Sequence, residues 1–298
     1  MSKITLATLK KLKRAGEPIS MLTCYDYPSA VMLQRAGVDC LLVGDSAAQM
    51  LLGQPTTLQA DLDIMVALAA AVRRGAPDAF LIGDMPFLSY QASVEDAVKN
   101  AGRFLREAGC DAVKMEVDSR FQEEVAAVAR AGIPVVAHLG FHVQAAAQAE
   151  TVVATRAADE ALRLIGDLEA VEDAGASIIL LECVTAEVAE IVASRTTLPV
   201  ISCGSGIGCD GQVLVLNDVL GLPGSAPVRF SKPFGSVSEA FEQAVTAYIE
   251  QVKGRQFPDD EHAYHMKPKD LQEFRKQLEA FDAELLEHHC DPSVPETP

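Results

Sequence analysis

Charged and polar side chains stand at the ends of successive short apolar runs in this sequence, and their types are those that carry chemistry. A single acid after a strand is usually the N-cap of a helix. Four acids, one Lys and one His at separate run ends exceed what folding alone requires, and they predict an active site. These residues are Asp45 and Ser46, Asp84, Lys114 and Glu116, His138, and Glu182.

The acids predict a cation. Carboxylates gathered at one place repel one another, so either some of them protonate or a cation neutralises them. Oxygen ligands without a Cys or His cluster favour Mg²⁺, and Asp45, Asp84 and Glu116 are the candidate metal residues. A metal held there would chelate a 2-oxo acid through its carboxylate and carbonyl, and would acidify the neighbouring carbon to give an enolate.

Two other residues have predicted roles in that chemistry. Lys114 lies two residues before Glu116, so both side chains point to one strand face, where Lys114 can neutralise the substrate carboxylate or the enolate oxygen. Glu182 follows the apolar run SIILL, and an apolar pocket raises a carboxyl pKa, so we predict it as the general acid/base. His138 is either a hydrogen-bonded core histidine or a catalytic one, and Gly204-Ser205-Gly206 is either an anion-binding turn or a plain turn.

The apolar runs predict the strands that position these residues. Each is rich in Val, Ile and Leu without strict alternation, which is typical of strands buried on both faces of a parallel sheet. Segments with helical spacing separate them, and Gly closes most of these segments. The strands are expected within 19–26, 36–46, 75–85, 108–117, 131–140, 174–184, 198–206 and 228–232, and the helices at 29–37, 61–75, 94–109, 121–132, 159–175, 186–194 and 236–253.

This unbroken alternation predicts an α/β fold, a (β/α)₈ TIM barrel with extra C-terminal helices, in preference to a doubly wound sheet. We expect the catalytic barrel over residues 1–255. A helical extension over 256–290 would pack on the barrel or form an oligomer contact. Residues 291–298 are expected to be a disordered tail. In such a barrel the active site forms where the strands end.

Composition excludes several classes of protein. The 298 residues carry 25 Lys and Arg against 42 Asp and Glu, a net charge of −17, which argues against nucleic-acid binding and against docking on anionic membranes. No apolar run has the length of a membrane span or follows the basic start as a signal peptide would. The seven cysteines include no CxxC pair, so free thiols and a cytoplasmic location are expected.

Seven phrases of the sequence together resemble the ketopantoate hydroxymethyltransferase family, over about Leu9 to Phe234. The resemblance implies a (β/α)₈ barrel of the phosphoenolpyruvate mutase and isocitrate lyase superfamily. It implies transfer of a one-carbon unit from 5,10-methylenetetrahydrofolate to 3-methyl-2-oxobutanoate, giving 2-dehydropantoate for pantothenate biosynthesis. The phrases are MLTCYDYPSA, AGVDCLLVGDS, AVRRGAPDAFLIGDMPFLSY, AVKMEV, IPVVAHLG, EDAGASIILLECV and CDGQVLVLNDVLGL.

By position, Asp45, Asp84 and Glu116 match the family's Mg²⁺ acids. The residues matching its oxo-acid contacts are Asp45, Ser46, Asp84 and Lys114, and Glu182 matches its proton acceptor. The resemblance also implies a cytoplasmic homo-oligomer, often a decamer, acting on a small 2-oxo acid.

The sequence departs from the family pattern beside this acid set. Where the family has a Gly-rich stretch resembling GGYKVQGR, residues 149–156 read AETVVATR; GIGAG has become SCGSG, ECVP has become ECVT, and a Tyr-His pair is replaced within Val66-Ala67-Leu68. Loss of glycines stiffens a loop and can change which donor or acceptor it admits. Two alternatives therefore stay open: a folate-independent aldolase or C–C lyase acting on another 2-oxo acid, and a degenerate barrel that only binds such an acid.

Overall fold

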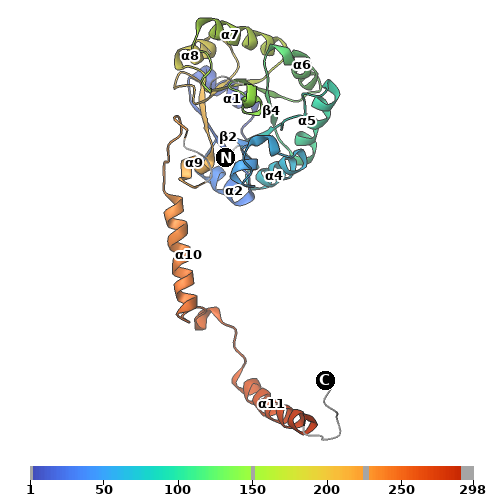
Figure 1. Ribbon diagram of the computed structural model, residues 1–298, viewed down its shortest axis with the longest axis vertical. Helices are drawn as coiled ribbons and strands as arrows, with labels where there is room; N and C mark the ends of the chain where they lie inside the picture. Colours follow the sequence, from blue (N-terminus) through green and yellow to red (C-terminus); the bar gives the residue numbers. More distant parts are fainter. Residues whose placement is uncertain (1–2, 149–151, 224–227, 290–298) are drawn as a thin grey trace. The chain divides into compact units, whose positions relative to one another are not determined.

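The computed structural model describes residues 3–148, 152–223 and 228–289. The chain divides into two compact units, Met1–Ser238 and Glu239–Pro298. The first unit contains the whole sheet and the helices around it, and the second contains most of α10 and all of α11 (Figure 1). The predicted boundary after residue 255 stays a prediction.

In the part of the chain that the structure describes, eight parallel strands close into one barrel, with β8 paired to β1. The first seven lie within the predicted runs, which confirms the (β/α)₈ fold. The strands are β1 (Ile19–Thr23), β2 (Cys40–Val43), β3 (Phe80–Asp84), β4 (Ala112–Glu116), β5 (Val135–Gly140), β6 (Ile178–Glu182), β7 (Val200–Cys203) and β8 (Gly211–Leu214).

The predicted position of the eighth strand, residues 228–232, is wrong. That segment is irregular, and β8 is instead the GQVL segment, which pairs with β7 and with residues 19–22 of β1. A Cβ on Gly211 would lie 2.5 Å from the Ile19 carbonyl oxygen, so glycine is needed for β8 to approach β1. Gly and Gln at its start lack the β-branched character by which the other strands are recognised.

Longer helices surround the strands in chain order (Figure 1), and five short helices lie in the connections within the described ranges. The predicted helix segments all contain helices, and an N-terminal one precedes them. The longer helices of the first unit are α1 (Leu6–Ala15), α2 (Tyr27–Ala36), α4 (Leu62–Gly75), α5 (Val94–Ala108), α6 (Gln122–Arg130), α7 (Ala158–Asp173) and α8 (Ala186–Arg195). The short ones are α3 (Ala47–Met50), η1 (Thr57–Gln59), η2 (Ser119–Phe121), η3 (Val143–Gln148) and α9 (Leu216–Leu220).

The sheet is buried on both faces. One set of alternating residues, including Leu42, Ile82 and Val136, forms a cluster inside the barrel. The other set packs under the helices. At Gly83 a Cβ would lie 2.3 Å from the Phe104 ring of α5, so the absence of a side chain lets that ring sit against β3. Burial of this kind stabilises a chain by roughly 25 cal/mol per Å² of apolar surface.

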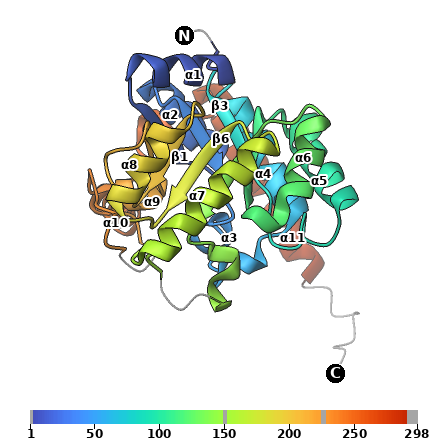
Figure 2. The same ribbon diagram turned by 90° about the horizontal axis from the view of Figure 1, so that it is seen from above.

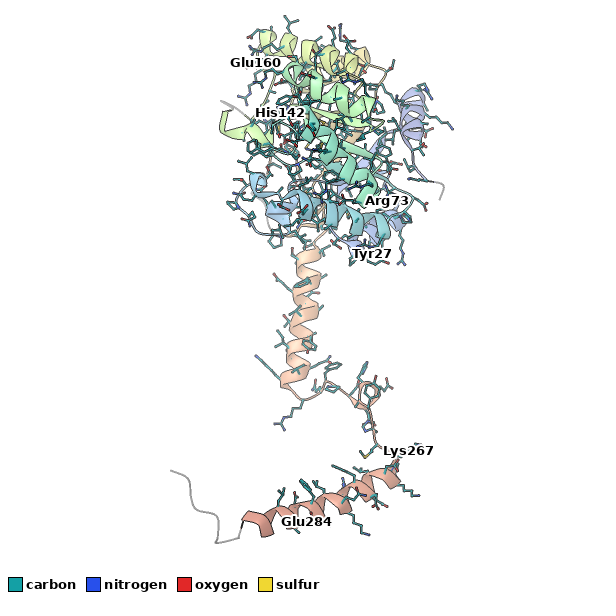
Figure 3. The ribbon with its side chains drawn as sticks, turned by 90° about the vertical axis from the view of Figure 1, so that its right-hand side faces the viewer. Tyr27, Arg73, His142, Glu160, Lys267 and Glu284 are labelled. Atoms are coloured by element: carbon teal, nitrogen blue, oxygen red, sulfur yellow. The ribbon has the colours of Figure 1, made fainter. Side chains whose placement is uncertain are left out.

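The two ends of the barrel differ. Helix α1 covers the end where the strands begin, and its Leu9 joins the inner cluster, while α3 lies at the opposite end (Figure 2). Arg73, at the end of α4, donates to the carbonyl oxygens of Ala76 and Ala79. Figure 3 shows Arg73 and His142 toward opposite ends of this unit. The strands therefore end on the side of the barrel that carries α3 and His142.

The second unit is helical and exposes apolar side chains. α11 (Pro268–His289) lies within the segment 256–290 that we expected to be helical, and α10 (Val237–Lys253) matches the helix expected at 236–253; η4 (Asp260–His262) lies between them. Phe241 and Tyr248 of α10, and Phe274 and Phe281 of α11, are exposed. Within the described residues, none of the helices combines the length and apolar character needed to cross a membrane. The predicted tail at 291–298 lies outside the described residues.

Candidate active site

The seven charged and polar residues predicted at the strand ends line one cavity of ≈ 220 Å³ at the carboxyl ends of the strands, whereas Ser205 of the candidate anion-binding turn is not part of its lining. The strand pattern explains why they meet. Ala112, Lys114 and Glu116 alternate along β4, so the two charged residues continue the row that faces the barrel interior. The same parity brings Asp84 of β3, His138 of β5 and Glu182 of β6 inside, whereas Asp45 and Ser46 follow the end of β2. The set is Asp45, Ser46, Asp84, Lys114, Glu116, His138 and Glu182.

Asp84 and Lys114 form a buried ion pair. The two residues are register partners across β3 and β4, and Lys114 Nζ lies 2.9 Å from Asp84 Oδ1. The backbone N–H of Asp45 donates to the other oxygen of Asp84 at 2.8 Å. Burial raises the pKa of Asp84 to about 7, although the Lys114 ammonium acts in the opposite direction. Burial alone would lower the pKa of Lys114, but Asp84, Asp45 and Glu116 raise it above its usual value, so Lys114 stays charged.

Glu116 is held at the end of β4 by Tyr90. The Tyr90 hydroxyl donates to the Glu116 carbonyl oxygen at 2.9 Å and accepts from its backbone N–H at 3.0 Å. The Glu116 side chain uses Oε2 to accept from the backbone N–H of Gln144. Its Oε1 has no hydrogen-bond partner among the described residues and lies 3.6 Å from His138 Nδ1. Burial raises the pKa of Glu116 to about 8.

His138 lies between Lys114 and Glu182. Its Nδ1 is 3.4 Å from Lys114 Nζ, and its Nε2 is 3.3 Å from Glu182 Oε2. Burial, followed by the charge of Lys114, lowers the pKa of His138 well below its usual value, so the ring is neutral. The sequence left a core role and a catalytic role open for this residue. The structure shows that His138 is buried and that its ring lies beside Lys114 and Glu182, the two residues with predicted roles in the reaction.

Glu182 ends β6 in surroundings suited to proton transfer near neutral pH. Burial raises its pKa to about 7, with Lys114 and the Cys203 thiol acting in the opposite direction. Its side chain is 18% exposed at the cavity wall, so the carboxyl group is accessible from the cavity. A carboxyl group that titrates near the working pH can accept and return a proton.

Three residues that depart from the family pattern, Thr155, Thr185 and Ser205, contact one another or the backbone around Glu182. Thr155 has φ 65°, a left-handed conformation that is strained for a β-branched residue. Its hydroxyl accepts from the Thr185 backbone N–H at 3.1 Å and lies 3.0 Å from the Thr185 hydroxyl. Ser205 donates to the Leu181 carbonyl oxygen and accepts from the Val184 backbone N–H. The Thr155, Thr185 and Ser205 hydroxyls thus fix the turn after Glu182. The Ser205 hydroxyl makes both of its hydrogen bonds to backbone atoms on either side of Glu182. The predicted loop residues 149–151 lie outside the described residues.

Some residues at the cavity were missed by the sequence analysis. Thr57 lines it, is buried, and has no hydrogen-bond partner for its hydroxyl among the described residues. Val228 and Phe230 line it from the segment that we predicted as a strand. Gln144 is buried between Asp45 and Glu116. An isolated Gln or Thr outside any motif carries no signal in a single sequence.

Within residues 3–148, 152–223 and 228–289, no three His, Cys, Asp or Glu side chains are grouped so that they could hold a metal ion. Asp45, Asp84 and Glu116 therefore share the cavity without forming a three-ligand cluster. The charge around them still favours a cation, because one ammonium group, that of Lys114, shares the cavity lining with five carboxyl groups, those of Asp45, Asp84, Glu116, Glu182 and Asp218. The unpartnered Glu116 Oε1 is an oxygen of the kind that Mg²⁺ binds.

Comparison with known proteins places these features in context. The family model described as ketopantoate hydroxymethyltransferase matches residues 3–260. The 3-methyl-2-oxobutanoate hydroxymethyltransferase of Anaeromyxobacter sp. (strain Fw109-5) is 44% identical over 268 residues, 88% of each chain. That of Carboxydothermus hydrogenoformans is 41% identical over 273 residues, 91% of this chain and 99% of its own.

Solved structures share the fold at low identity. A phosphonopyruvate hydrolase in complex with oxalate and Mg²⁺ has a TM-score of 0.58 and 14% identity, over 96% of this chain and 100% of that one. A 2,3-dimethylmalate lyase, a member of the PEP mutase/isocitrate lyase superfamily, has a TM-score of 0.55 and 18% identity, with the same coverage. Both agree with the barrel described above.

Proposed function

Because the chain belongs to the ketopantoate hydroxymethyltransferase family, we propose that it transfers a hydroxymethyl group to 3-methyl-2-oxobutanoate, giving 2-dehydropantoate. The observation that carries the proposal is the convergence of five carboxyl groups, the Lys114 ammonium and neutral His138 on one cavity. The one-carbon donor is 5,10-methylenetetrahydrofolate, and the product serves pantothenate biosynthesis, as the family resemblance implies.

The chain's own residues account for the first chemical step. The carboxylate of Glu182 takes the single proton on C3 of the substrate, and the electron pair left behind spreads onto the 2-oxo oxygen. Lys114, held by Asp84 at 2.9 Å, supports the negative charge on the substrate carboxylate or on that oxygen. His138 is 3.3 Å from Glu182 and restricts the position of the base. C3 can then form its bond to the one-carbon unit as the bonds from that unit to the folate nitrogens break; the nitrogens keep the electron pairs and take up protons, and one water supplies the hydroxyl group of the product.

We propose that Mg²⁺ is held by Asp45, Asp84 and Glu116. The excess of carboxyl groups over ammonium groups and the unpartnered Glu116 Oε1 support this. When bound, the ion supplies Lewis-acid polarisation of the 2-oxo group. Ser46, with its hydroxyl 2.8 Å from that of Tyr25, and Lys114 are the proposed contacts to the oxo acid beside these acids.

Product analysis tests the proposed function. The full chain with Mg²⁺, 3-methyl-2-oxobutanoate and 5,10-methylenetetrahydrofolate is expected to form 2-dehydropantoate, measured by mass spectrometry, and to form none when the folate is left out. Cleavage of other 2-oxo acids without folate would favour the aldolase or lyase alternative. Binding of a 2-oxo acid with no turnover of any substrate would favour the degenerate barrel.

We expect kcat/KM to rise with pH through about 7, because the proposed base must be ionised and burial raises the pKa of Glu182 to about 7. The measurement is the rate of C3 hydrogen exchange at saturating Mg²⁺, from about pH 5.5 to about pH 9. A rate that stays constant across this range would contradict the assignment of Glu182 as the base.

We also propose a cytoplasmic homo-oligomer, with a decamer suggested by the family resemblance. Free thiols at all six described cysteines support a reducing compartment. Exposed Phe241, Tyr248, Phe274 and Phe281 on α10 and α11 support an assembly that covers them. Light scattering on the purified chain measures the subunit number, and a monomer at all concentrations would contradict the assembly.

A further inference from the structure

Gln144 contacts two of the three acids proposed to hold Mg²⁺. It lies in η3, which follows β5, and is 6% exposed. Its backbone N–H donates to Glu116 Oε2 at 3.0 Å, and its side-chain Nε2 donates to Asp45 Oδ2 at 3.1 Å. One residue thus joins an acid after β2 to an acid at the end of β4.

Gln144 hydrogen-bonds to one of the two carboxylate oxygens of Glu116 and to one of Asp45. Gln144 engages one oxygen of Glu116 and leaves Oε1 without a hydrogen-bond partner among the described residues. It engages Oδ2 of Asp45. Asp84 differs, since its Oδ2 accepts from the Asp45 backbone N–H and its Oδ1 is paired with Lys114 at 2.9 Å. A carboxylate fixed through one oxygen has its second oxygen in a defined direction, which is the arrangement that a metal ligand needs.

Gln144 is itself fixed. Its Nε2 also donates to the Met85 carbonyl oxygen at 3.1 Å, so both hydrogens of the amide are used. Its Oε1 accepts from Gln91 Nε2 at 3.3 Å. A buried amide with both ends engaged has one orientation, and it transmits that orientation to the acid that it contacts.

We propose that Gln144 is a positioning residue of the metal site, which orients Asp45 through its side-chain amide and Glu116 through its backbone N–H. This inference rests on the proposed Mg²⁺ site. Gln144 does not bind the metal or the substrate; it sets the direction of the oxygens that do. Loss of such an outer hydrogen bond typically weakens metal binding by about 10- to 100-fold.

Isothermal titration of the metal-free full chain with Mg²⁺ tests this. Gln144→Met keeps the side-chain length and removes both N–H donors, so its Kd for Mg²⁺ is expected to rise roughly 10- to 100-fold. Gln144→Ala, which leaves space for water, is the second variant in case the thioether does not pack. Gln122→Met is the matched control, because the Gln122 amide donates to the Ala170 carbonyl oxygen, outside the cavity lining.

Further readouts separate positioning from folding. The Tm of each metal-free variant should stay near that of the wild type, and saturating Mg²⁺ should restore most of kcat while the Mg²⁺ concentration for half-maximal activity rises. An unchanged Kd in a folded Gln144→Met or Gln144→Ala protein overturns the inference while the metal site stands. No Mg²⁺ binding by the wild type overturns the metal site, and the inference with it.

Discussion

Replacing Glu182 with Gln is expected to slow exchange of the C3 hydrogen of 3-methyl-2-oxobutanoate by about 100- to 10,000-fold, the contribution typical of a positioned general base. The substitution keeps the volume of the side chain beside His138 and Cys203, and it removes the group that accepts the proton. Loss of the C3 proton signal in D₂O, followed by NMR with Mg²⁺ present, measures the step without requiring the folate.

A control on the same barrel separates this effect from general charge loss. Glu169→Gln removes an exposed carboxylate of α7 that pairs with Arg195, and its exchange rate should equal that of the wild type. Binding of the oxo acid should change little in Glu182→Gln, so the loss should be in the rate at saturation and not in KM. Wild-type exchange by Glu182→Gln would assign the base to another group of the cavity.

The sequence predicted the barrel and the gathering of the site for the same physical reason. Strands buried on both faces are continuous apolar runs, so a charged residue within or just after one is conspicuous. Lys114 and Glu116 are two positions apart on β4, and this spacing alone places both inside the barrel with Ala112. Parallel strands then bring these ends together, whatever the intervening helices contain.

What the sequence could not predict depends on contacts between distant segments. β8 was misplaced because it begins with a glycine, which has low strand propensity. Glycine is required there because the β1 backbone lies too close to leave room for a side chain. Gln144 gains its role from two acids that lie 99 and 28 residues away in the chain. The Thr155–Thr185 hydrogen bonds likewise link two departures that look independent in the sequence. Contacts of this kind between distant residues leave no periodic pattern in the sequence from which they could be predicted.

Lys114→Met is expected to destabilise the fold as well as to stop turnover. Lys114 and Asp84 have side chains 6% and 1% exposed. Among the described residues that line the cavity, the other charged side chains, of Asp45, Glu116, Glu182 and Asp218, are all acidic. Removing one partner of a buried pair leaves the other charge uncompensated, which costs about 3–5 kcal/mol. A fall in Tm of roughly 10 °C should follow, measured by calorimetry in metal-free buffer.

The pH dependence of this loss distinguishes charge from packing. Without the Lys114 ammonium the pKa of Asp84 should rise further in the folded state, because Lys114 is the group that lowers it. A carboxyl group whose pKa is higher folded than unfolded binds more protons when folded, so stability falls as pH rises. The deficit of Lys114→Met should therefore be larger at about pH 8 than at about pH 5.5. A loss of packing alone would give the same deficit at both. Lys99→Met, which removes an exposed pair with Glu95, should leave the Tm near that of the wild type at either pH.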